Sequence, residues 1–297
     1  MKNLLILTDF NDDSAYVLHY AMNLGQAVQG KVFLFHNADL PLDYSSTYAG
    51  SNLFMTGDVA LGAIPAFPGS TVPLTELEQV QKDKLQTIAA NLQKSYGNAT
   101  PIEALFKWGS LNENISNVVK EAQIDLILID NNNTNSFLDR LAGTDTGSVI
   151  NDIPCPVLII PAAAKFNSIS HITYAAEVVE NDFLFLDQLI PFAQAFNAQV
   201  TLVHIRSEAA NETNISQEYI AAINQRYPHL KQEIIELRGK TVAEGLENFV
   251  ITYKTDVLAI GHYKQGFFSS LFHESITDHL TFRTTIPLLS LPDKIRS

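Results

Sequence analysis

The sequence has a single cysteine among 297 residues, and it lacks any apolar run near the roughly 18–20 residues that a membrane-spanning helix needs. One cysteine excludes an internal disulfide framework and is typical of proteins of the reducing cytoplasm. The N-terminal apolar stretch meets an acidic residue at Asp9, which makes it too short for a secretory signal peptide. We therefore expect a cytoplasmic protein without a membrane partner.

Positive charge is also scarce. Nineteen Lys and Arg face 32 Asp and Glu, the formal net charge is −13, and the acidity is dispersed along the chain. Nucleic acids are bound by basic surfaces, so no nucleic-acid partner is expected. The sequence also lacks a Walker lysine motif, a nucleophile elbow and histidine pairs at the i, i+4 spacing of helical metal ligands. It thus predicts no catalytic residue, no metal site and no enzyme.

The main positive feature of the sequence is a long internal repeat. Asp9 precedes His36 by 27 residues, and Glu177 precedes His204 by the same 27. Each of these four residues follows a short apolar run. The later part of the repeat pairs Gly109 with Gly239, Asp125 with Asp256, Pro156 with Pro287 and Pro161 with Pro292. A repeat this long indicates duplicated domains, which we place at 1–164 and 165–297.

Each copy alternates apolar runs with helical patterns. Strands are expected near 3–8, 31–36, 102–106, 126–129 and 156–161, and again near 170–175, 199–204, 232–237, 257–260 and 287–291. Continuously apolar strands between helices predict an α/β fold, with a mostly parallel sheet covered on both faces. We expect two doubly wound, five-stranded sheets of order 3-2-1-4-5. The last strands would be exposed edges, so the copies should pack through them as an internal pseudo-dimer.

The first copy alone carries an insert at about 38–75, rich in Pro and Gly but also in apolar side chains. A long irregular segment of this kind is usually functional. Three interpretations stay open, namely a lid over the ligand crevice, a contact with another chain in a homodimer, and a loop packed on its own domain.

The expected ligand site lies at the switch in strand order. Ligands of doubly wound sheets bind outside the carboxyl ends of the strands at this point. In the order 3-2-1-4-5, the strands that end near Asp9 and Asp130 are neighbours, so both residues should face one crevice. Asp9 either hydrogen-bonds a small-molecule ligand there or caps the helix that follows it.

The chain resembles the universal stress protein family in its tandem two-domain form. The resemblance is carried by Leu7-Thr8-Asp9-Phe10, Phe35-His36, Ala142-Gly143-Thr144 and the closing run 153–161. It implies a stress-response protein that binds a small ligand, ATP or another adenine nucleotide, without turnover. In the family, the strand-end Asp contacts adenosine, and a loop of Gly, two residues, Gly, nine residues and Gly-Ser or Gly-Thr holds the phosphates, because glycines let backbone amides approach them.

The resemblance implies binding residues in both copies. They are Leu7, Thr8, Asp9, Asn37, Ile129, Asp130, Asn133, Gly143, Thr144 and Thr146 in the first copy, and Glu177, Gly261, Lys264 and Ser275 in the second. The phosphate loop is incomplete in each copy. Asp130 and Asn133 stand where the first copy should have glycines, while the second copy keeps Gly261 but has Lys264 and Glu274 at the later glycine positions.

These departures bear on affinity. A carboxylate about 4 Å from a phosphate charge costs on the order of 4 kcal/mol at an effective dielectric near 20, unless a cation intervenes. Mg²⁺ is therefore expected only together with a nucleotide. Asp9 and Gly143 favour the first copy as the nucleotide site, since Glu177 and Glu274 replace their counterparts in the second. Two alternatives remain, a degenerate interaction scaffold that binds no nucleotide and a slow ATP hydrolase.

Overall fold

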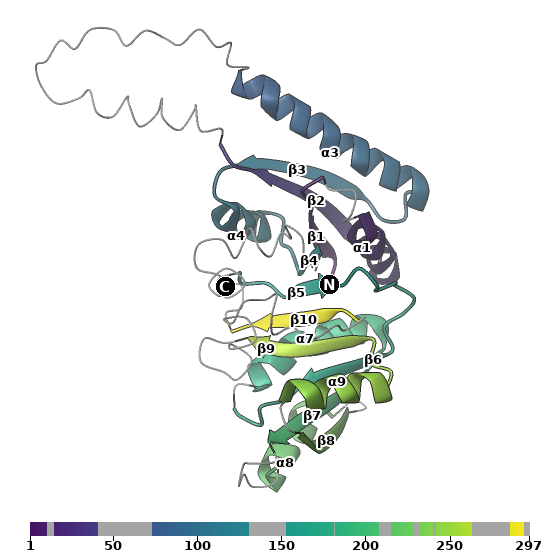
Figure 1. The fold of residues 1–297 in the computed structure, drawn as a ribbon, viewed down its shortest axis with the longest axis vertical. Coiled ribbons are helices and arrows are strands. Elements are labelled where there is room, and N and C mark those ends of the chain that lie inside the picture. The colour runs from purple at the N-terminus through teal and green to yellow at the C-terminus, as the bar shows by residue number, and fades with distance from the viewer. Residues whose placement is uncertain are drawn as a thin grey trace, which may run out of the picture.

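The computed structural model describes residues 1–10, 15–40, 73–130, 153–180, 182–207, 215–228, 232–239, 242–262 and 286–293. These residues form one ten-stranded sheet with helices packed on it, and the two halves of the chain follow one another along the long axis (Figure 1). Most of the insert expected at 38–75 lies outside the described residues.

The two halves have matching element orders. The first half contains β1 (Asn3–Leu7), α1 (Ala15–Val28), β2 (Lys31–Ala38), α3 (Leu74–Tyr96), β3 (Ile102–Trp108), α4 (Leu111–Glu121), β4 (Leu126–Asp130) and β5 (Val157–Ile160). The second half contains β6 (His171–Ala175), α7 (Asp182–Phe196), β7 (Gln199–Ser207), α8 (Gln217–Arg226), β8 (Gln232–Gly239), α9 (Val242–Thr252), β9 (Val257–His262) and β10 (Leu288–Pro292). All ten strands lie within a few residues of the ranges predicted from their apolar runs.

The sheet is mostly parallel, which confirms the α/β class expected from the sequence. Its strand order is β3-β2-β1-β4-β5-β10-β9-β6-β7-β8. The central strands are apolar along their whole length because both faces of the sheet are covered; the five residues of β4, for example, are all buried. Each half reads 3-2-1-4-5 from its outer edge to the middle of the sheet.

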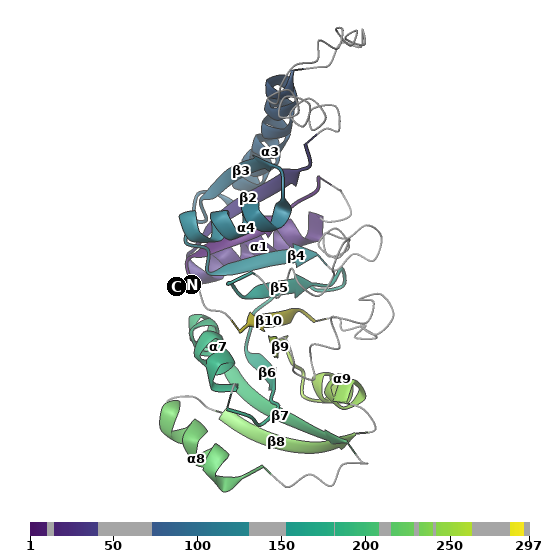
Figure 2. The ribbon, with the colours of Figure 1, turned by 90° about the vertical axis from the view of Figure 1, so that its left-hand side faces the viewer.

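Helices cover the two faces unequally. One apolar core gathers side chains of α1, α3, α7 and α8 against one face of the sheet, and the other gathers side chains of α4 and α9 against the opposite face. Figure 2 shows α7 and α8 on one side of the second half and α9 on the other. Because each strand alternates its side chains between the faces, both cores draw on the same strands.

The two halves join through their last strands. β5 pairs with β10 in antiparallel register, with Leu288 opposite Ile159, Leu289 opposite Leu158 and Ser290 opposite Val157. This is the pairing that the proline-bounded edge strands predicted. It removes two exposed sheet edges, which would otherwise offer unpaired backbone groups to another chain.

The backbone repeats in detail between the halves. Three pairs of non-glycine residues adopt the left-handed conformation at matching places: Phe10 with Val178, Gln29 with Asn197, and Gln123 with Lys254. Non-glycine residues rarely adopt positive φ, so shared positions of this kind show that the same turns are built twice.

Hydrogen bonds that start the strands are also duplicated. Asp125 Oδ2 accepts the backbone N–H groups of Lys2 and Asn3, at 2.6 and 3.0 Å. Asp256 Oδ2 accepts those of Ser170 and His171 in the same way, at 2.7 and 2.9 Å. Asp125 and Asp256, which directly precede β4 and β9, therefore tie these strands to β1 and β6, their neighbours in the sheet.

Candidate functional site

The expected ligand edge of the first half forms where β1 and β4 end side by side. β1 pairs with β4 in parallel register, with Ile6 opposite Leu128. Leu7 and Ile129 follow in the two strands, and their side chains are buried in the core, so only their backbone can face a ligand. Beyond them the carboxyl edge carries Thr8, Asp9 and Asp130, as the strand order predicts.

A tight turn after β1 orients Asp9. Thr8 donates its backbone N–H to Phe35 O at 3.0 Å, and Phe10 donates its N–H to Thr8 Oγ1 at 3.2 Å. Phe10 then adopts φ 65°, which reverses the chain directly after the carboxylate. Thr8 and Asp9 remain half-buried at the edge, whereas Asp130 is 93% buried, with 7% of its surface exposed.

His36 has a structural position beside this turn. Its Nδ1 lies 2.7 Å from Thr8 O, and because a carbonyl can only accept, Nδ1 carries the proton in this contact. The imidazole lies 4.0 Å from the Phe10 ring and 5.8 Å from the Phe106 ring, centroid to centroid. Phe106 in turn meets Trp108 edge-on at 5.0 Å. These aromatic rings fill the carboxyl ends of β1, β2 and β3.

Asn37 uses its side chain within the protein. Its Nδ2 donates to Gly109 O at 2.8 Å, and its Oδ1 accepts from Asn114 Nδ2, also at 2.8 Å. Gly109 has φ 101°, a conformation that favours glycine, so this amide supports the turn between β3 and α4. A ligand contact from Asn37 would therefore come from its backbone.

The equivalent edge of the second half is filled. The ring of Phe185 on α7 lies against the backbone of Gly261 at the end of β9, and a Cβ placed on Gly261 would stand 2.2 Å from Phe185 Cδ2. Among the described residues, the crevice beside Glu177 that these two residues line has no room for a water molecule. Gly261 thus accommodates an aromatic ring in this structure.

A buried carboxylate occupies the same region. Asp182, with 2% of its surface exposed, accepts hydrogen bonds from Tyr174 Oη at 2.7 Å and Tyr219 Oη at 2.9 Å. It also accepts the backbone N–H groups of Val179 at 3.1 Å and Glu177 at 3.4 Å. Burial, followed by the nearby charge of Asp182, raises the pKa of Tyr174 well above its ordinary value. This network anchors the loop that carries Glu177, and sequence reasoning did not single it out.

The two edges differ by a correlated pair of residues. Phe185 and Gly261 in the second half correspond to Val17 and Asp130 in the first, by the offsets of the repeat. The large ring of Phe185 leaves room only for a glycine at position 261. In the first half, the smaller Val17 stands together with the carboxylate of Asp130. The structure thus brings Thr8, Asp9 and Asp130 to one edge and Glu177 and Gly261 to another, on opposite sides of the β5–β10 seam.

Several predicted binding residues lie outside the described residues. They are Asn133, Gly143, Thr144 and Thr146 of the first copy, and Lys264 and Ser275 of the second. Their roles stay predictions. Among the described residues, no group of three or more His, Cys, Asp or Glu is placed to hold a metal ion.

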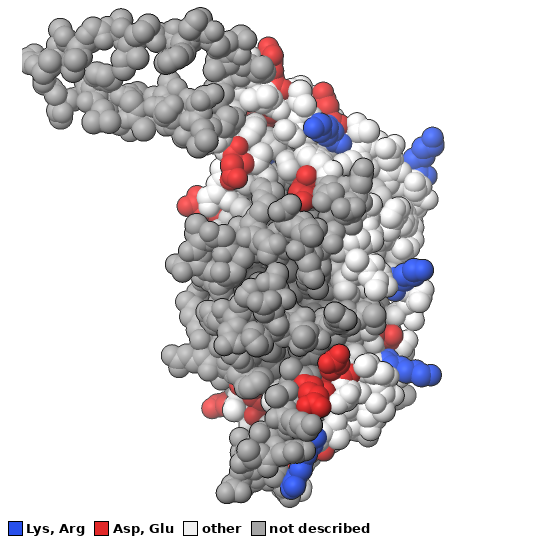
Figure 3. Space-filling view, in the orientation of Figure 1, with Lys and Arg blue, Asp and Glu red and all other residues white. Residues whose placement is uncertain are grey.

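The charged surface fits the bulk composition. On the face drawn in Figure 3, acidic side chains are scattered among uncharged ones, and Lys and Arg of the described residues form no continuous patch. Within the described parts of the chain, no helix has both the length and the apolarity that crossing a membrane requires.

The strand order and the covering helices define a doubly wound α/β protein. Residues 63–161 match the model of the universal stress protein family. The match covers about a third of the chain and includes the closing run 153–161, one of the segments that carry the resemblance. A search of curated proteins found no match.

Solved structures share the fold over almost the entire chain. A universal stress protein from Archaeoglobus fulgidus DSM 4304 is 12% identical, with a TM-score of 0.64 over 98% of this chain and 96% of that one. A functionally unknown protein from Pseudomonas aeruginosa PAO1 is 14% identical, with a TM-score of 0.56 over 98% of this chain and 92% of that one. At these identities the likeness establishes the fold.

Proposed function

We propose that this protein is a cytoplasmic stress-response protein of two duplicated domains, 1–164 and 165–297, that binds a small ligand in its first domain without turning it over. Duplication is supported by the shared left-handed positions and by the matching roles of Asp125 and Asp256. The joined last strands are the proposed domain interface.

The proposed ligand is an adenine nucleotide, ATP in the first instance. The observation that carries the assignment to the first domain is the packing of Phe185 on Gly261, because it closes the second crevice. The first domain has Val17 at the corresponding place, and it keeps Asp9 at the strand end. Asp9 would hydrogen-bond the ribose or base, and Gly143 with Thr144 would receive the phosphates at a helix N-terminus.

Electrostatics favour binding of the nucleotide as its magnesium complex. Asp130 ends β4 at the same edge as Asp9, so two carboxylates lie beside the proposed crevice. Uncompensated repulsion of this kind costs several kcal/mol, roughly 4 kcal/mol at 4 Å and a dielectric near 20. A divalent cation bound to the phosphates offsets that repulsion.

Equilibrium binding of ATP, with and without Mg²⁺, tests the proposal. The matched variants are Asp9→Ala and Glu177→Ala, which remove the corresponding carboxylate from each domain. Loss of a charge-assisted hydrogen bond costs about 1.5–3 kcal/mol, so Asp9→Ala should weaken binding roughly tenfold or more. Glu177→Ala should leave the affinity unchanged. A stronger effect of Glu177→Ala would move the site to the second domain.

Replacement of the phosphate-loop glycine gives an independent check. Gly143→Leu should weaken ATP binding, because a side chain would stand where backbone amides approach the phosphates. Unchanged affinity in Gly143→Leu, together with loss on altering Gly261, would reverse the assignment. Absence of any binding to the unmodified chain would favour the alternative function, an interaction scaffold, for which the closed second crevice is the supporting observation.

A further inference from the structure

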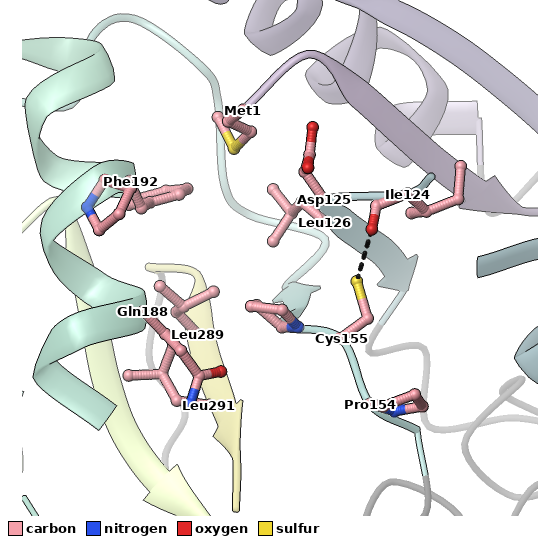
Figure 4. Close-up of a pocket in the computed structure, with 12 residues that line it drawn as sticks. Met1, Ile124, Asp125, Leu126, Pro154, Cys155, Gln188, Phe192, Leu289 and Leu291 are labelled. Atoms are coloured by element: carbon pink, nitrogen blue, oxygen red, sulfur yellow. Dashed lines mark hydrogen bonds between the residues drawn. The ribbon is translucent and has the colours of Figure 1, made fainter. Parts of the chain in front are cut away.

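A cavity opens at the seam between the two halves, where the β5–β10 ladder stops. The last antiparallel partners are Val157 and Ser290, and the next residue on the β5 side is Pro156, which has no N–H to donate. The chain before it bends toward β4, where Cys155 Sγ donates to Ile124 O at 3.6 Å. Figure 4 shows the space left between this segment, β10 and α7.

The cavity has a volume of about 210 Å³, and its walls come from both halves. They are mainly apolar and include Leu126, Cys155, Phe192, Leu289 and Leu291. The cavity is partly open to solvent, because Asp125 and Pro191, which also line it, are exposed. For comparison, an engineered apolar cavity of about 150 Å³ in another protein stays dry and binds benzene. The seam cavity therefore has room for one aromatic ring.

The corresponding position on the other side of the seam carries a buried tyrosine. Gln188 on α7, which lines the cavity, corresponds to Tyr20 on α1. Tyr20 is 4% exposed, and its ring meets Phe166 edge-on at 5.2 Å. Burial, followed by the nearby charge of Asp256, raises the pKa of Tyr20. Asp256, whose charge contributes to this shift, corresponds to Asp125, another residue lining the cavity.

Gln188 leaves that space open. Its Nε2 donates to Pro292 O at 2.9 Å and to Leu184 O at 3.2 Å, so the amide is held by its own helix and by the end of β10. By the offset of the repeat, the cavity borders the position at which the other half carries the buried ring of Tyr20, and it is bounded by Phe192 and the leucines of β10.

We propose that the seam cavity binds a small aromatic molecule of the phenol class, with its ring between Phe192 and Leu289 and its hydroxyl toward Asp125. The ligand would replace the side chain that Tyr20 supplies on the opposite side. This site is separate from the proposed nucleotide crevice, so ATP binding and phenol binding are independent. Small-molecule sites commonly occur at domain interfaces, with apolar walls and few polar groups.

A titration with 4-methylphenol, the side-chain analogue of tyrosine, tests the proposal. The full-length chain should bind it, as followed by calorimetry. Gln188→Tyr should fill the cavity with its own ring. It should weaken binding by roughly tenfold or more, because the ring would occupy the volume that the ligand needs. Gln188→Asn, which keeps the cavity open, should bind like the parent. Equal binding by the parent and Gln188→Tyr, or no binding by the parent, would overturn the proposal.

Cys155 provides a second readout that needs no variant. It is the single cysteine of the chain, is 2% exposed and lines the cavity, so a thiol reagent reports on this site alone. Saturating 4-methylphenol should slow its labelling several-fold, because a filled cavity blocks the approach to a buried thiol. An unchanged labelling rate at saturation would contradict binding in the cavity, even if calorimetry detected heat from elsewhere.

Discussion

The ring of Phe185 lies on the backbone of Gly261, with room for no atom between them. A Cβ at Gly261 would stand 2.2, 2.4 and 2.7 Å from three carbons of that ring. The contact closes the ligand edge of the second half at the place where a phosphate loop would begin. A glycine that resembles a phosphate-binding residue in the sequence therefore has a packing role in the folded chain.

Gly261→Ala should destabilise the protein by about 1–3 kcal/mol, the usual cost of overpacking. Gly261 is not in the left-handed region, so the cost is steric. Urea unfolding of Gly261→Ala, Phe185→Leu and the double variant would measure the coupling. The double variant should be more stable than the sum of the single effects predicts, because the smaller side chain makes room for the methyl group. Additive effects would contradict the contact.

Stability should fall in alkaline solution because of the buried tyrosines. Folding raises the pKa of Tyr174 above its ordinary value of 10.0. Above pH 10 the unfolded tyrosine loses its proton while the folded one keeps it, so the free energy of unfolding falls with rising pH. The slope is up to about 1.4 kcal/mol per pH unit for this one group, and the contribution is fully present below pH 10.

Tyr174→Phe should flatten that alkaline slope, at a cost near neutral pH of about 1–3 kcal/mol from the hydrogen bond lost by Asp182. Urea unfolding at several pH values measures both effects. Tyr253→Phe is the matched control, because Tyr253 is 50% exposed. Tyr253→Phe should leave the alkaline slope of the unfolding free energy unchanged. If both substitutions changed that slope equally, Tyr174 would not be its source.

The seam should be a main source of stability. Leu158 and Leu289 face each other across the β5–β10 pair, and both are 0% exposed. Leu158→Ala should cost about 2–5 kcal/mol, by lost burial and by the cavity that it leaves. Ile251→Ala serves as the control, because Ile251 on α9 is 72% exposed. It should change the free energy of unfolding by roughly 0.5 kcal/mol or less. A small effect at Leu158 would mean that the halves are held together elsewhere.

ATP should remain essentially uncleaved over hours. Hydrolysis needs a positioned water and charge stabilisation of the departing phosphate, and the segment 129–139, which begins at the end of β4, contains neither Lys nor Arg. Phosphate release with Mg²⁺ is the measurement, run beside Asp130→Ala to exclude contaminating ATPases. Sustained release that disappears in Asp130→Ala would make the protein an enzyme, the slow ATP hydrolase that the sequence left open.

Much of the fold could be read from the sequence. Strands such as β4 and β5 are buried on both faces, so their apolar runs marked them without reference to any partner. The proline-bounded ends of β5 and β10 likewise predicted their pairing, because an exposed edge is unfavourable for either half alone. The equal spacing of Asp9 with His36 and of Glu177 with His204 revealed the repeat. Each histidine forms a hydrogen bond to the backbone carbonyl of the residue that directly follows β1 or β6.

The site depended more on tertiary structure. Asp182 and Tyr219 are 37 residues apart in the sequence, and Phe185 and Gly261 are farther apart. No local sequence pattern therefore predicts either contact. The difference between Gln188 and Tyr20 is visible in the sequence, but only packing shows that Gln188 lines a cavity whereas the ring of Tyr20 is buried against Phe166. Local propensity and burial pattern determine strands and turns, whereas the shape of a crevice results from side chains that folding brings together from distant positions.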